Sequence, residues 1–390
     1  MKYDIILFEN FHAAFHHKYD VHLIARLLRS QGKTVAILNV YGEDKPEDYS
    51  GIDLLNIPIN ESVPDDKSWL ESKGNTVKRL YYIVVFLSQQ RRYMKAVRKF
   101  VEDKADSFYL GSYHLLMPSV FFSLNKPCYY WGLRSYRMTG FWQAFKSNPF
   151  MAFRMVYLKK LFLKNEYQKL FVSNEIIKNE FIQIGVPEKR LVIREERCIE
   201  DIKDFSPEVK DEEFSLLVIG GLRKQKHIET TIRAFKDASQ KNSLLRLVGE
   251  NKDEIYEKII EDEIGDCQNI ERINKRLEYE EFLGYMTRSH FTLFADEKGK
   301  SSITNGTMME SIINFTPIIA PNYNPFAYYI DKYGIGISYK PGDVNSYSET
   351  IKKAKEIGYE CFIDKIKIFQ KTLEFNNIAR QLYIAVNYMS

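Results

Sequence analysis

The sequence contains little that would cross-link the chain or carry it across a membrane. Its four cysteines stand far apart, and none forms a CxxC pair. This spacing argues against a disulfide framework and favours reduced thiols in a cytosol. The longest apolar run, near residues 81–87, is too short to cross a bilayer. The first residues carry an acid and then a strand pattern, which is not the pattern of a signal peptide.

Clusters of metal-binding side chains are also scarce. No Asp-x-Asp pair follows a predicted strand, and no cysteine accompanies the three histidines His12, His16 and His17. Histidines in such a stretch make a poor metal site. We therefore expect no bound metal ion and no separate cofactor.

Charge is present in quantity but is unevenly distributed. Residues 1–205 hold 31 Lys/Arg against 24 Asp/Glu, whereas residues 206–390 hold 25 against 28. Within the first half, residues 78–170 hold 17 basic and 4 acidic side chains. A field of one sign this strong favours an anionic partner, either lipid headgroups or a phosphorylated acceptor. A solvated basic face without a partner is the alternative, and no RNA-binding signature is present, so we expect no nucleic acid.

Aromatic and basic side chains recur together in two predicted helical segments, residues 78–100 and 141–164. Such a composition is typical of helices that lie in a membrane interface, with aromatic rings inserted and amines on anionic headgroups. The rings could equally be core residues of packed helices. The membrane interpretation predicts a cytoplasmic protein attached peripherally to the inner face of the cell membrane.

Alternating strand and helix patterns occur twice along the chain. Residues 3–8 and 35–40 predict strands on either side of a helix that ends at Gly32, and the same order restarts at strand 214–219. This pattern predicts an α/β protein with two Rossmann-like domains that face each other across a cleft. We expect an N-terminal domain over 1–205, a C-terminal domain over 206–372, and a final helix over 373–390 packing back toward the N-terminal domain.

A polar loop in the second half is the strongest candidate for a binding site. It lies between a predicted strand at 291–295 and another at 317–320 and runs into a short helix near Gly306. Free N–H groups at the start of such a helix, at the carboxyl edge of a parallel sheet, favour a phosphate-bearing ligand. Ser302 and Asn305 could bind phosphate or sugar hydroxyls, or could simply satisfy the turn. The helix start at Asn305, Gly306 and Thr307 could stabilise the charge of a phosphate group.

Several motifs in the C-terminal half resemble the donor domain of the retaining GT-B glycosyltransferases, glycosyltransferase family 4 and its relatives. The resemblance covers most of residues 165–390 and rests on the order of its pieces, which are residues 172–193, 219–226, 232–235, 247–250, 270–286 and 307–320. It implies the GT-B fold, a nucleotide-sugar substrate linked to UDP or GDP, and transfer with retention.

The resemblance also implies roles for particular residues. Lys226 falls on the lysine that holds the donor diphosphate, and Glu310 falls on the glutamate that contacts the ribose hydroxyls. Asn274 lies in the segment that flanks the nucleotide base. Thr307 and Glu310 also have the spacing of a capping box, so Glu310 could instead cap its helix.

Two positions depart from the family pattern. Gly221 stands where the family has an arginine, so Arg223 or Lys224 would have to supply the cation. Ser302 stands where the family has the first glutamate of a pair. Because that carboxylate usually contacts the sugar, the identity of the sugar is not implied.

On the acceptor side, two histidines are the candidates for a catalytic role. His114 follows a predicted strand at a place where the family often has a histidine beside the donor sugar. His12 lies in the loop after the first strand, where it could contact the acceptor. The resemblance therefore implies a retaining hexosyltransferase, and the lack of an Asp-x-Asp pair after a predicted strand predicts that it needs no metal ion.

The expected acceptor is a lipid-linked or oligosaccharide molecule, as in surface polysaccharide biosynthesis. Two alternatives stay open: a nucleotide-sugar epimerase of GT-B fold, and a catalytically inert GT-B subunit that binds a partner or a membrane. The departures at Gly221 and Ser302 favour the inert subunit, whereas the basic aromatic segments argue against the epimerase.

Overall fold

The computed structural model of the chain forms two compact units, one of residues 1–195 with 375–390 and one of residues 196–374. The structure describes residues 2–8, 15–39, 52–56, 85, 88, 91–92, 95–110, 125–131, 166–183, 185–195, 197–200, 205–206, 209–238, 241–295 and 305–387. The predicted segment 141–164 lies outside the described residues, and of 78–100 only the end from residue 95 is described as a continuous helix. No helix among the described residues is long and apolar enough to span a membrane.

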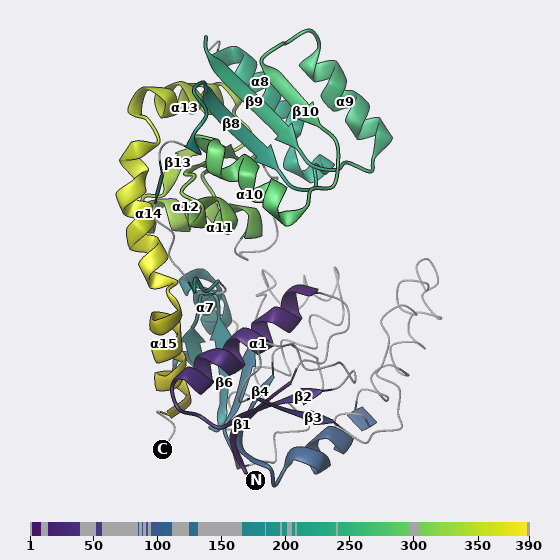
Figure 1. Ribbon diagram of the computed structural model, residues 1–390, viewed down its shortest axis with the longest axis vertical. Coiled ribbons are helices and arrows are strands. Elements are labelled where there is room, and N and C mark those ends of the chain that lie inside the picture. The colour runs from purple at the N-terminus through teal and green to yellow at the C-terminus, as the bar shows by residue number, and fades with distance from the viewer. Residues whose placement is uncertain are drawn as a thin grey trace. The chain divides into compact units, whose positions relative to one another are not determined.

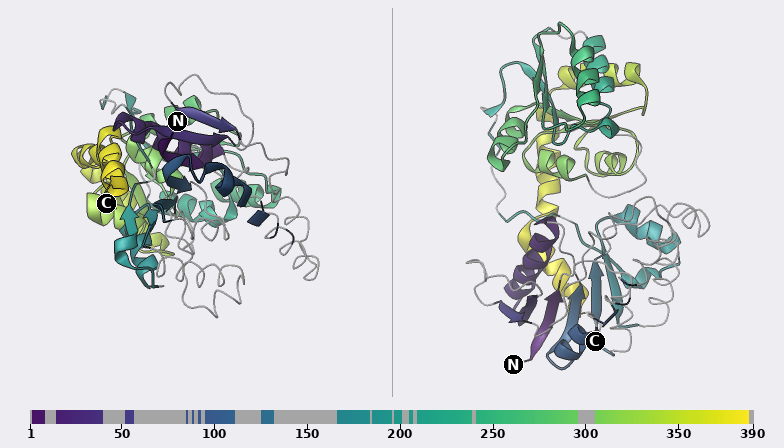
Figure 2. Two further views of the ribbon diagram at one scale, coloured as in Figure 1. Left: turned by 90° about the horizontal axis from the view of Figure 1, so that it is seen from below. Right: turned by 90° about the vertical axis from the view of Figure 1, so that its right-hand side faces the viewer.

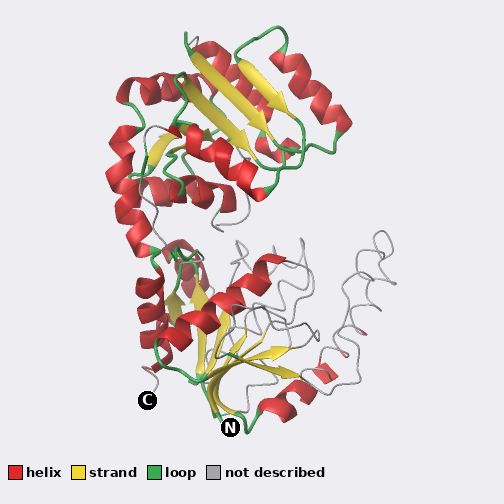
Figure 3. Ribbon diagram, in the orientation of Figure 1, coloured by secondary structure: helices red, strands yellow, loops and turns green. Residues whose placement is uncertain are grey.

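The first unit is built on a seven-stranded parallel sheet with the order β3-β2-β1-β4-β5-β6-β7. Strand β1, which lies between β2 and β4 in this sheet, is buried on both faces at Ile5, Ile6 and Leu7, as a parallel sheet covered by helices requires. The strands are β1 (Tyr3–Phe8), β2 (Val35–Asn39), β3 (Asp53–Asn56), β4 (Ala105–Leu110), β5 (Cys128–Trp131), β6 (Gln168–Val172) and β7 (Leu191–Ile193). Figures 1 and 3 show this sheet below the helices α1 and α7.

The helices of the first unit include the end of the chain. They are α1 (Phe15–Ser30), α7 (Glu175–Gln183) and α15 (Phe375–Asn387), with a 3-10 turn η1 at Glu188–Arg190. α15 packs against α1, as Figures 1 and 2 show. The contact is reinforced where the Tyr129 hydroxyl donates to the Val386 carbonyl at 2.8 Å and Arg26 lies over the ring of Phe375.

One strand of the first sheet was not predicted. Residues 42–53 are largely polar and predict no strand, whereas Asp53–Asn56 forms edge strand β3 beside β2. Its two polar ends and two leucines give no alternation long enough to predict a strand. The hydroxyl of Tyr3 donates to the Asp53 carboxylate at 2.8 Å, a tertiary contact that the local pattern cannot reveal.

The second unit holds a six-stranded parallel sheet with the order β10-β9-β8-β11-β12-β13. Its strands are β8 (Phe214–Ile219), β9 (Ser243–Val248), β10 (Ile270–Ile273), β11 (Phe291–Leu293), β12 (Ile318–Pro321) and β13 (Gly336–Tyr339). Its helices are α8 (Ile228–Ala238), α9 (Glu254–Ile264), α10 (Tyr279–Arg288), α11 (Gly306–Ile313), α12 (Phe326–Tyr333), α13 (Val344–Ile357) and α14 (Glu360–Thr372), with the 3-10 turn η3 at Lys224–Lys226. The prediction of an α/β protein with two parallel sheets is confirmed.

The central strand of the second sheet shows why this sequence folds as it does. Leu216 and Val218 point into the large hydrophobic core of the unit, whereas Leu217 and Ile219 pack with Met286 of α10 on the opposite face. These four consecutive side chains of β8 are therefore buried, two on each face. An apolar run buried on both faces needs helices on both faces of its sheet, as Figure 1 shows for this unit.

Candidate functional site

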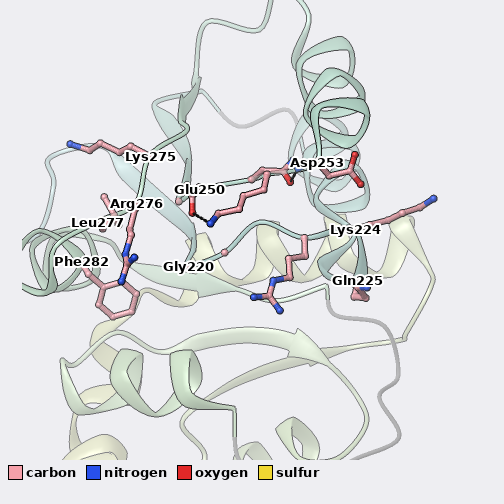
Figure 4. Close-up of a pocket in the computed structure, with 14 residues that line it drawn as sticks. Gly220, Lys224, Gln225, Glu250, Asp253, Lys275, Arg276, Leu277 and Phe282 are labelled. Carbon is pink, nitrogen blue, oxygen red and sulfur yellow. Dashed lines mark hydrogen bonds and ion pairs between the residues drawn. The ribbon is translucent and has the colours of Figure 1, made fainter. Parts of the chain in front are cut away.

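A cavity of about 620 Å³ opens in the second unit where β8, β9 and β10 end. Because parallel strands present their carboxyl ends on one edge of the sheet, the loops that follow these strands meet there. Figure 4 shows the cavity with Gly220 in its wall. The lining residues are Gly220, Gly221, Arg223, Lys224, Gln225, Gly249, Glu250, Asn251, Lys252, Asp253, Lys275, Arg276, Leu277 and Phe282.

Two glycines allow the turns after β8 and β9 to approach each other. Gly249 has φ of 132°, and a Cβ atom on it would lie only 2.1 Å from the Gly220 carbonyl oxygen. Gly220 itself has φ of 95°. Only glycine accepts both the conformation and the contact, so this part of the cavity wall consists of bare backbone that a ligand can approach closely.

Lys226 ends the turn η3 and points back toward the end of β8. Its Nζ donates to the Ile219 carbonyl at 3.0 Å. A Cβ atom placed on Gly220 would lie 3.5 Å from Lys226 Nζ and 3.7 Å from Thr307 Oγ1. The structure therefore brings the predicted residues Lys226 and Thr307 to the same side of Gly220.

The two other candidate cations of this turn differ in direction. Arg223 and Gly221 both line the cavity, and Arg223 Nε lies 3.8 Å from the position of a Cβ on Gly221. Lys224 extends outward, away from Gly220, in Figure 4. Of the two alternatives for the missing arginine, the geometry therefore favours Arg223 over Lys224.

Helix α11 begins beside Lys226 and is capped by Asn305. The Asn305 side chain accepts a hydrogen bond from the Met308 N–H at 3.1 Å, as a helix N-cap does. Among the described residues, the backbone N–H groups of Gly306 and Thr307 have no acceptor. The start of α11 therefore presents unsatisfied donors and the positive end of the helix dipole to the space beside Lys226.

Glu310 does not cap α11, so the capping-box alternative is wrong. Its carboxylate oxygen Oε1 lies 3.1 Å from Nη2 of Arg197, and Oε2 accepts from the Tyr279 hydroxyl at 3.4 Å. Only 15% of the Glu310 side chain is exposed. Burial raises the pKa of Tyr279, and the negative charge of Glu310 raises it further, so the hydroxyl keeps its proton and remains a donor.

Sequence reasoning missed both partners of Glu310. Arg197 lies in an acidic stretch near the boundary between the two units, where it reads as a solvated residue. Tyr279 marks only the start of α10 in the sequence pattern. The exposure of Tyr279 and the stacking of its ring on Phe282, at a centroid distance of 6.5 Å, are visible only in the structure, so the sequence offered no signal for either partner.

Asn274 lies outside the cavity lining and hydrogen-bonds to a residue that belongs to it. Its Oδ1 accepts from the Asn251 N–H at 3.0 Å, and Asn274 is not among the residues that line the cavity. Asn251, which does line it, donates through Nδ2 to Glu257 at 2.9 Å. The contact seen for Asn274 therefore fixes the loop after β9.

Arg272 holds the ends of β9 and β10 together. Its guanidinium pairs with Glu257 at 2.7 Å and donates to the carbonyl groups of Leu247, Gly249 and Ile273. Burial raises the pKa of Glu257, but hydrogen bonds from Arg272 and Asn251 outweigh it and lower the pKa below its ordinary value. The ion pair between Arg272 and Glu257 thus stabilises the loops that form the cavity.

The remaining predicted site residues are not described. Ser302, His12 and His114 lie outside the described residues. Within the described ranges, no group of three or more His, Cys, Asp or Glu side chains could hold a metal ion. The assembled site therefore consists of Lys226, Arg223, Gly221, Asn305, Gly306, Thr307 and Glu310, together with Arg197 and Tyr279. Such a site could bind a ligand that carries an anionic group, held by the cationic side chains, and neighbouring hydroxyls, which would donate to the Glu310 carboxylate.

Comparisons with known proteins agree with this geometry. Residues 200–361 match the family model of the glycosyl transferases group 1. No curated protein sequence matches the chain.

Several solved structures have the same fold over the whole chain. The Anabaena protein HepE (Alr3699), solved in complex with UDP, superposes with a TM-score of 0.68 and 11% identity over 100% of both chains. A glycosyltransferase from Rickettsia africae gives 0.67 and 14% over 100% of both chains. WaaG, a glycosyltransferase involved in lipopolysaccharide biosynthesis, gives 0.58 and 15% over 98% of this chain and 99% of that one. The chain therefore has the GT-B fold, and residues 200–361, which lie largely in its second unit, are similar to the glycosyl transferases group 1.

Proposed function

We propose that this protein transfers a sugar from a nucleoside diphosphate sugar to an acceptor, with the second unit binding the donor. The observation that carries the proposal is the convergence of Lys226 with the N-terminus of α11 beside the cavity that Gly220 lines. A nucleoside fits a cavity of about 620 Å³, since small-molecule pockets range over roughly 300–1,000 Å³. The diphosphate would then lie against Lys226 and α11.

The chemistry follows from where the charges lie. When the bond between the anomeric carbon and the diphosphate breaks, negative charge develops on the leaving oxygen. The ammonium of Lys226 and the N–H groups of Gly306 and Thr307 would stabilise that charge without a metal ion. The Glu310 carboxylate, held by Arg197 and Tyr279, would accept hydrogen bonds from the ribose hydroxyls.

The donor and acceptor classes rest on the relatives and on the sequence. HepE was solved with UDP, with UDP and glucose, and with UDP-glucose, which supports a UDP-linked sugar. WaaG acts in lipopolysaccharide biosynthesis, which supports a lipid-linked or oligosaccharide acceptor and a role in surface polysaccharide biosynthesis. We further propose that the transfer retains the anomeric configuration and that His114 and His12 take part in catalysis. The basic segments 78–100 and 141–164 would attach the protein peripherally to the inner face of the membrane.

The test combines binding with turnover. Thermal unfolding of the full chain is measured with UDP, GDP, TDP and CMP sugars, and hydrolysis of the stabilising sugar is then measured. We expect one base to raise the unfolding temperature. Lys226→Ala should abolish most of that rise, because a charge-assisted hydrogen bond contributes about 1.5–3 kcal/mol.

Lys236→Ala is the matched control, since Lys236 is an exposed lysine of the same unit that lies on α8 outside the cavity lining. If the two variants lost the same share of the ligand-induced rise in unfolding temperature, the result would contradict the role of Lys226. Binding without hydrolysis or transfer would favour the inert GT-B subunit, and exchange of one nucleotide sugar for its epimer would favour the epimerase.

A further inference from the structure

We propose that Arg197 is a second cation of the donor diphosphate site, acting with Lys226. The proposal rests on the proposed function, because it assigns a further residue to the same donor. Arg197 lies on the short segment of residues 197–200, next to the boundary at which the chain enters the second unit. Neither the family pattern nor the loop motifs assign it a role.

The first argument is the set of donors that Arg197 leaves unused. Nη2 of Arg197 faces Glu310 Oε1 at 3.1 Å, and within the described part of the chain no acceptor lies against Nε or Nη1 of Arg197. An arginine offers five N–H donors in a fixed plane. With 41% of its side chain exposed, Arg197 is held at one edge of its guanidinium and is open at the other.

The second argument is the place at which the guanidinium lies. A Cβ atom on Gly306 would be 3.8 Å from Nη2 of Arg197, which puts the guanidinium beside the first residue of α11. The next residue, Thr307, places its Oγ1 near Gly220 together with Lys226 Nζ. Arg197 and Lys226 thus both lie near the first turn of α11.

The third argument concerns the charge of Glu310. This carboxylate lies about one turn inside α11, close to where the diphosphate would bind. Two anionic groups at that separation repel each other unless a cation lies between or beside them. Arg197 neutralises the carboxylate and leaves roughly half of its lone-pair sites available, because Tyr279 takes one site on the other oxygen.

Two other roles can be separated from this one by experiment. If Arg197 served only to orient Glu310, its loss would weaken ribose binding and leave the phosphate contribution intact. Alternatively, Arg223, which lines the cavity beside Gly221, could supply the second cation. A comparison of a nucleoside with its diphosphate distinguishes all three roles, since only the diphosphate carries the charge.

The experiment is calorimetric titration of the full chain with the nucleoside and the nucleoside diphosphate of the base found in the sugar panel, uridine and UDP or guanosine and GDP. Arg197→Ala, Arg197→Lys and Arg223→Ala are compared with the wild type. Arg233→Ala is the matched control, because Arg233 pairs with Glu263 at 2.7 Å and lies on α8 outside the cavity lining.

We expect Arg197→Ala to lower the affinity for the nucleoside diphosphate by at least about tenfold, because a hydrogen bond between charged groups contributes that much to affinity. The affinity for the nucleoside should fall by less than about twofold. Arg197→Lys should fall between, because it keeps the charge and loses the planar fork. Arg233→Ala should change neither affinity.

Equal weakening of nucleoside and diphosphate by Arg197→Ala would overturn the proposal, leaving Arg197 as a support for Glu310. A loss of diphosphate binding in Arg223→Ala but not in Arg197→Ala or Arg197→Lys would overturn it in favour of Arg223. If the wild type binds none of the nucleotides, the proposed function fails as well. Tight wild-type binding that is insensitive to both Arg197 variants would overturn this inference alone.

Discussion

Gly249 shows how much a single residue can constrain this site. The turn after β9 needs φ of 132°, and the Gly220 carbonyl oxygen occupies the space that a Cβ atom would fill. Both demands come from the close approach of two loops, so the sequence alone shows only a glycine after a strand. The structure adds the reason that no other residue suits this position.

We predict that Gly249→Ala destabilises the second unit and removes nucleotide binding. A Cβ at 2.1 Å from a backbone oxygen forces the two loops apart, in addition to about 1–3 kcal/mol of backbone strain. Thermal unfolding and a nucleotide titration measure both effects. Gly342→Ala is the control, because Gly342 also has positive φ but has nothing within 4 Å of its Cβ position. Indistinguishable unfolding temperatures for the two variants would refute the prediction.

Glu310 illustrates what sequence reasoning can and cannot supply for a side chain. The resemblance placed this residue correctly on α11, but its spacing from Thr307 also suggested a capping box. Asn305 takes the capping position, and Arg197 and Tyr279, which lie 113 and 31 positions away along the chain, hold the carboxylate. Contacts between distant segments depend on the fold, and no local pattern encodes them.

At the scale of elements, strands with continuous apolar runs could be predicted and the short polar ones could not. β8 and β9 follow from buried residues bounded by glycine, and α11 follows from the loop that precedes it. β3 was missed because Asp53 and Asn56 flank only two leucines. Pairing with β2 stabilises β3 as a strand, so its existence is a tertiary property.

The pair of Glu257 on α9 and Arg272 on β10 should make the second unit sensitive to acid. Its hydrogen bonds hold the pKa of Glu257 below the ordinary value of 4.5, so the folded state binds this proton less readily than the unfolded state. The pair therefore contributes its full stability above about pH 4.5. That contribution is lost as the pH falls through the lowered pKa of the folded state.

We predict that Glu257→Gln lowers the free energy of unfolding by about 1–3 kcal/mol at pH 7, because Arg272 loses its charged partner. The difference between the variant and the wild type should shrink as the pH falls below 4.5. Denaturant unfolding at several pH values between 7 and 3.5 measures it. A difference that stays constant over this range would show that the Glu257 charge contributes nothing.

At the scale of the whole molecule, the alternation of strands and helices was sufficient to predict two parallel α/β units. Their limits were harder to predict, because the structure divides the chain after Glu195 and again after Glu374. The acidic composition near residues 199–213 resembles a linker. In the structure, however, the Ile199 N–H donates to the Leu373 carbonyl at 2.8 Å, which places this segment inside the second unit.

The assignment of α15 to the first unit gives a prediction at this scale. Leu382 is 1% exposed on the buried face of α15, so Leu382→Ala should destabilise the first unit by about 2–5 kcal/mol. Affinity for the nucleotide should stay unchanged, since the proposed donor residues lie in the second unit.

Urea unfolding and nucleotide titration of Leu382→Ala check the two halves of this prediction. Ile384→Ala is the control, because Ile384 belongs to the same helix and is 46% exposed. A weaker nucleotide affinity in Leu382→Ala, with the second unit still folded, would contradict the separation of the two units.

The bridge between Ile199 and Glu374 has a consequence for how such chains can be recombined. The second unit enters and leaves through adjacent, parallel stretches of backbone, so it is a guest inserted into a host made of the first unit. Because the two ends of the inserted unit are already held together by this bridge, the insertion adds little to the entropic cost of folding the first unit, whatever its length. Exchange of residues 196–374 for the matching cassette of a relative would therefore alter donor choice while the host keeps its own fold.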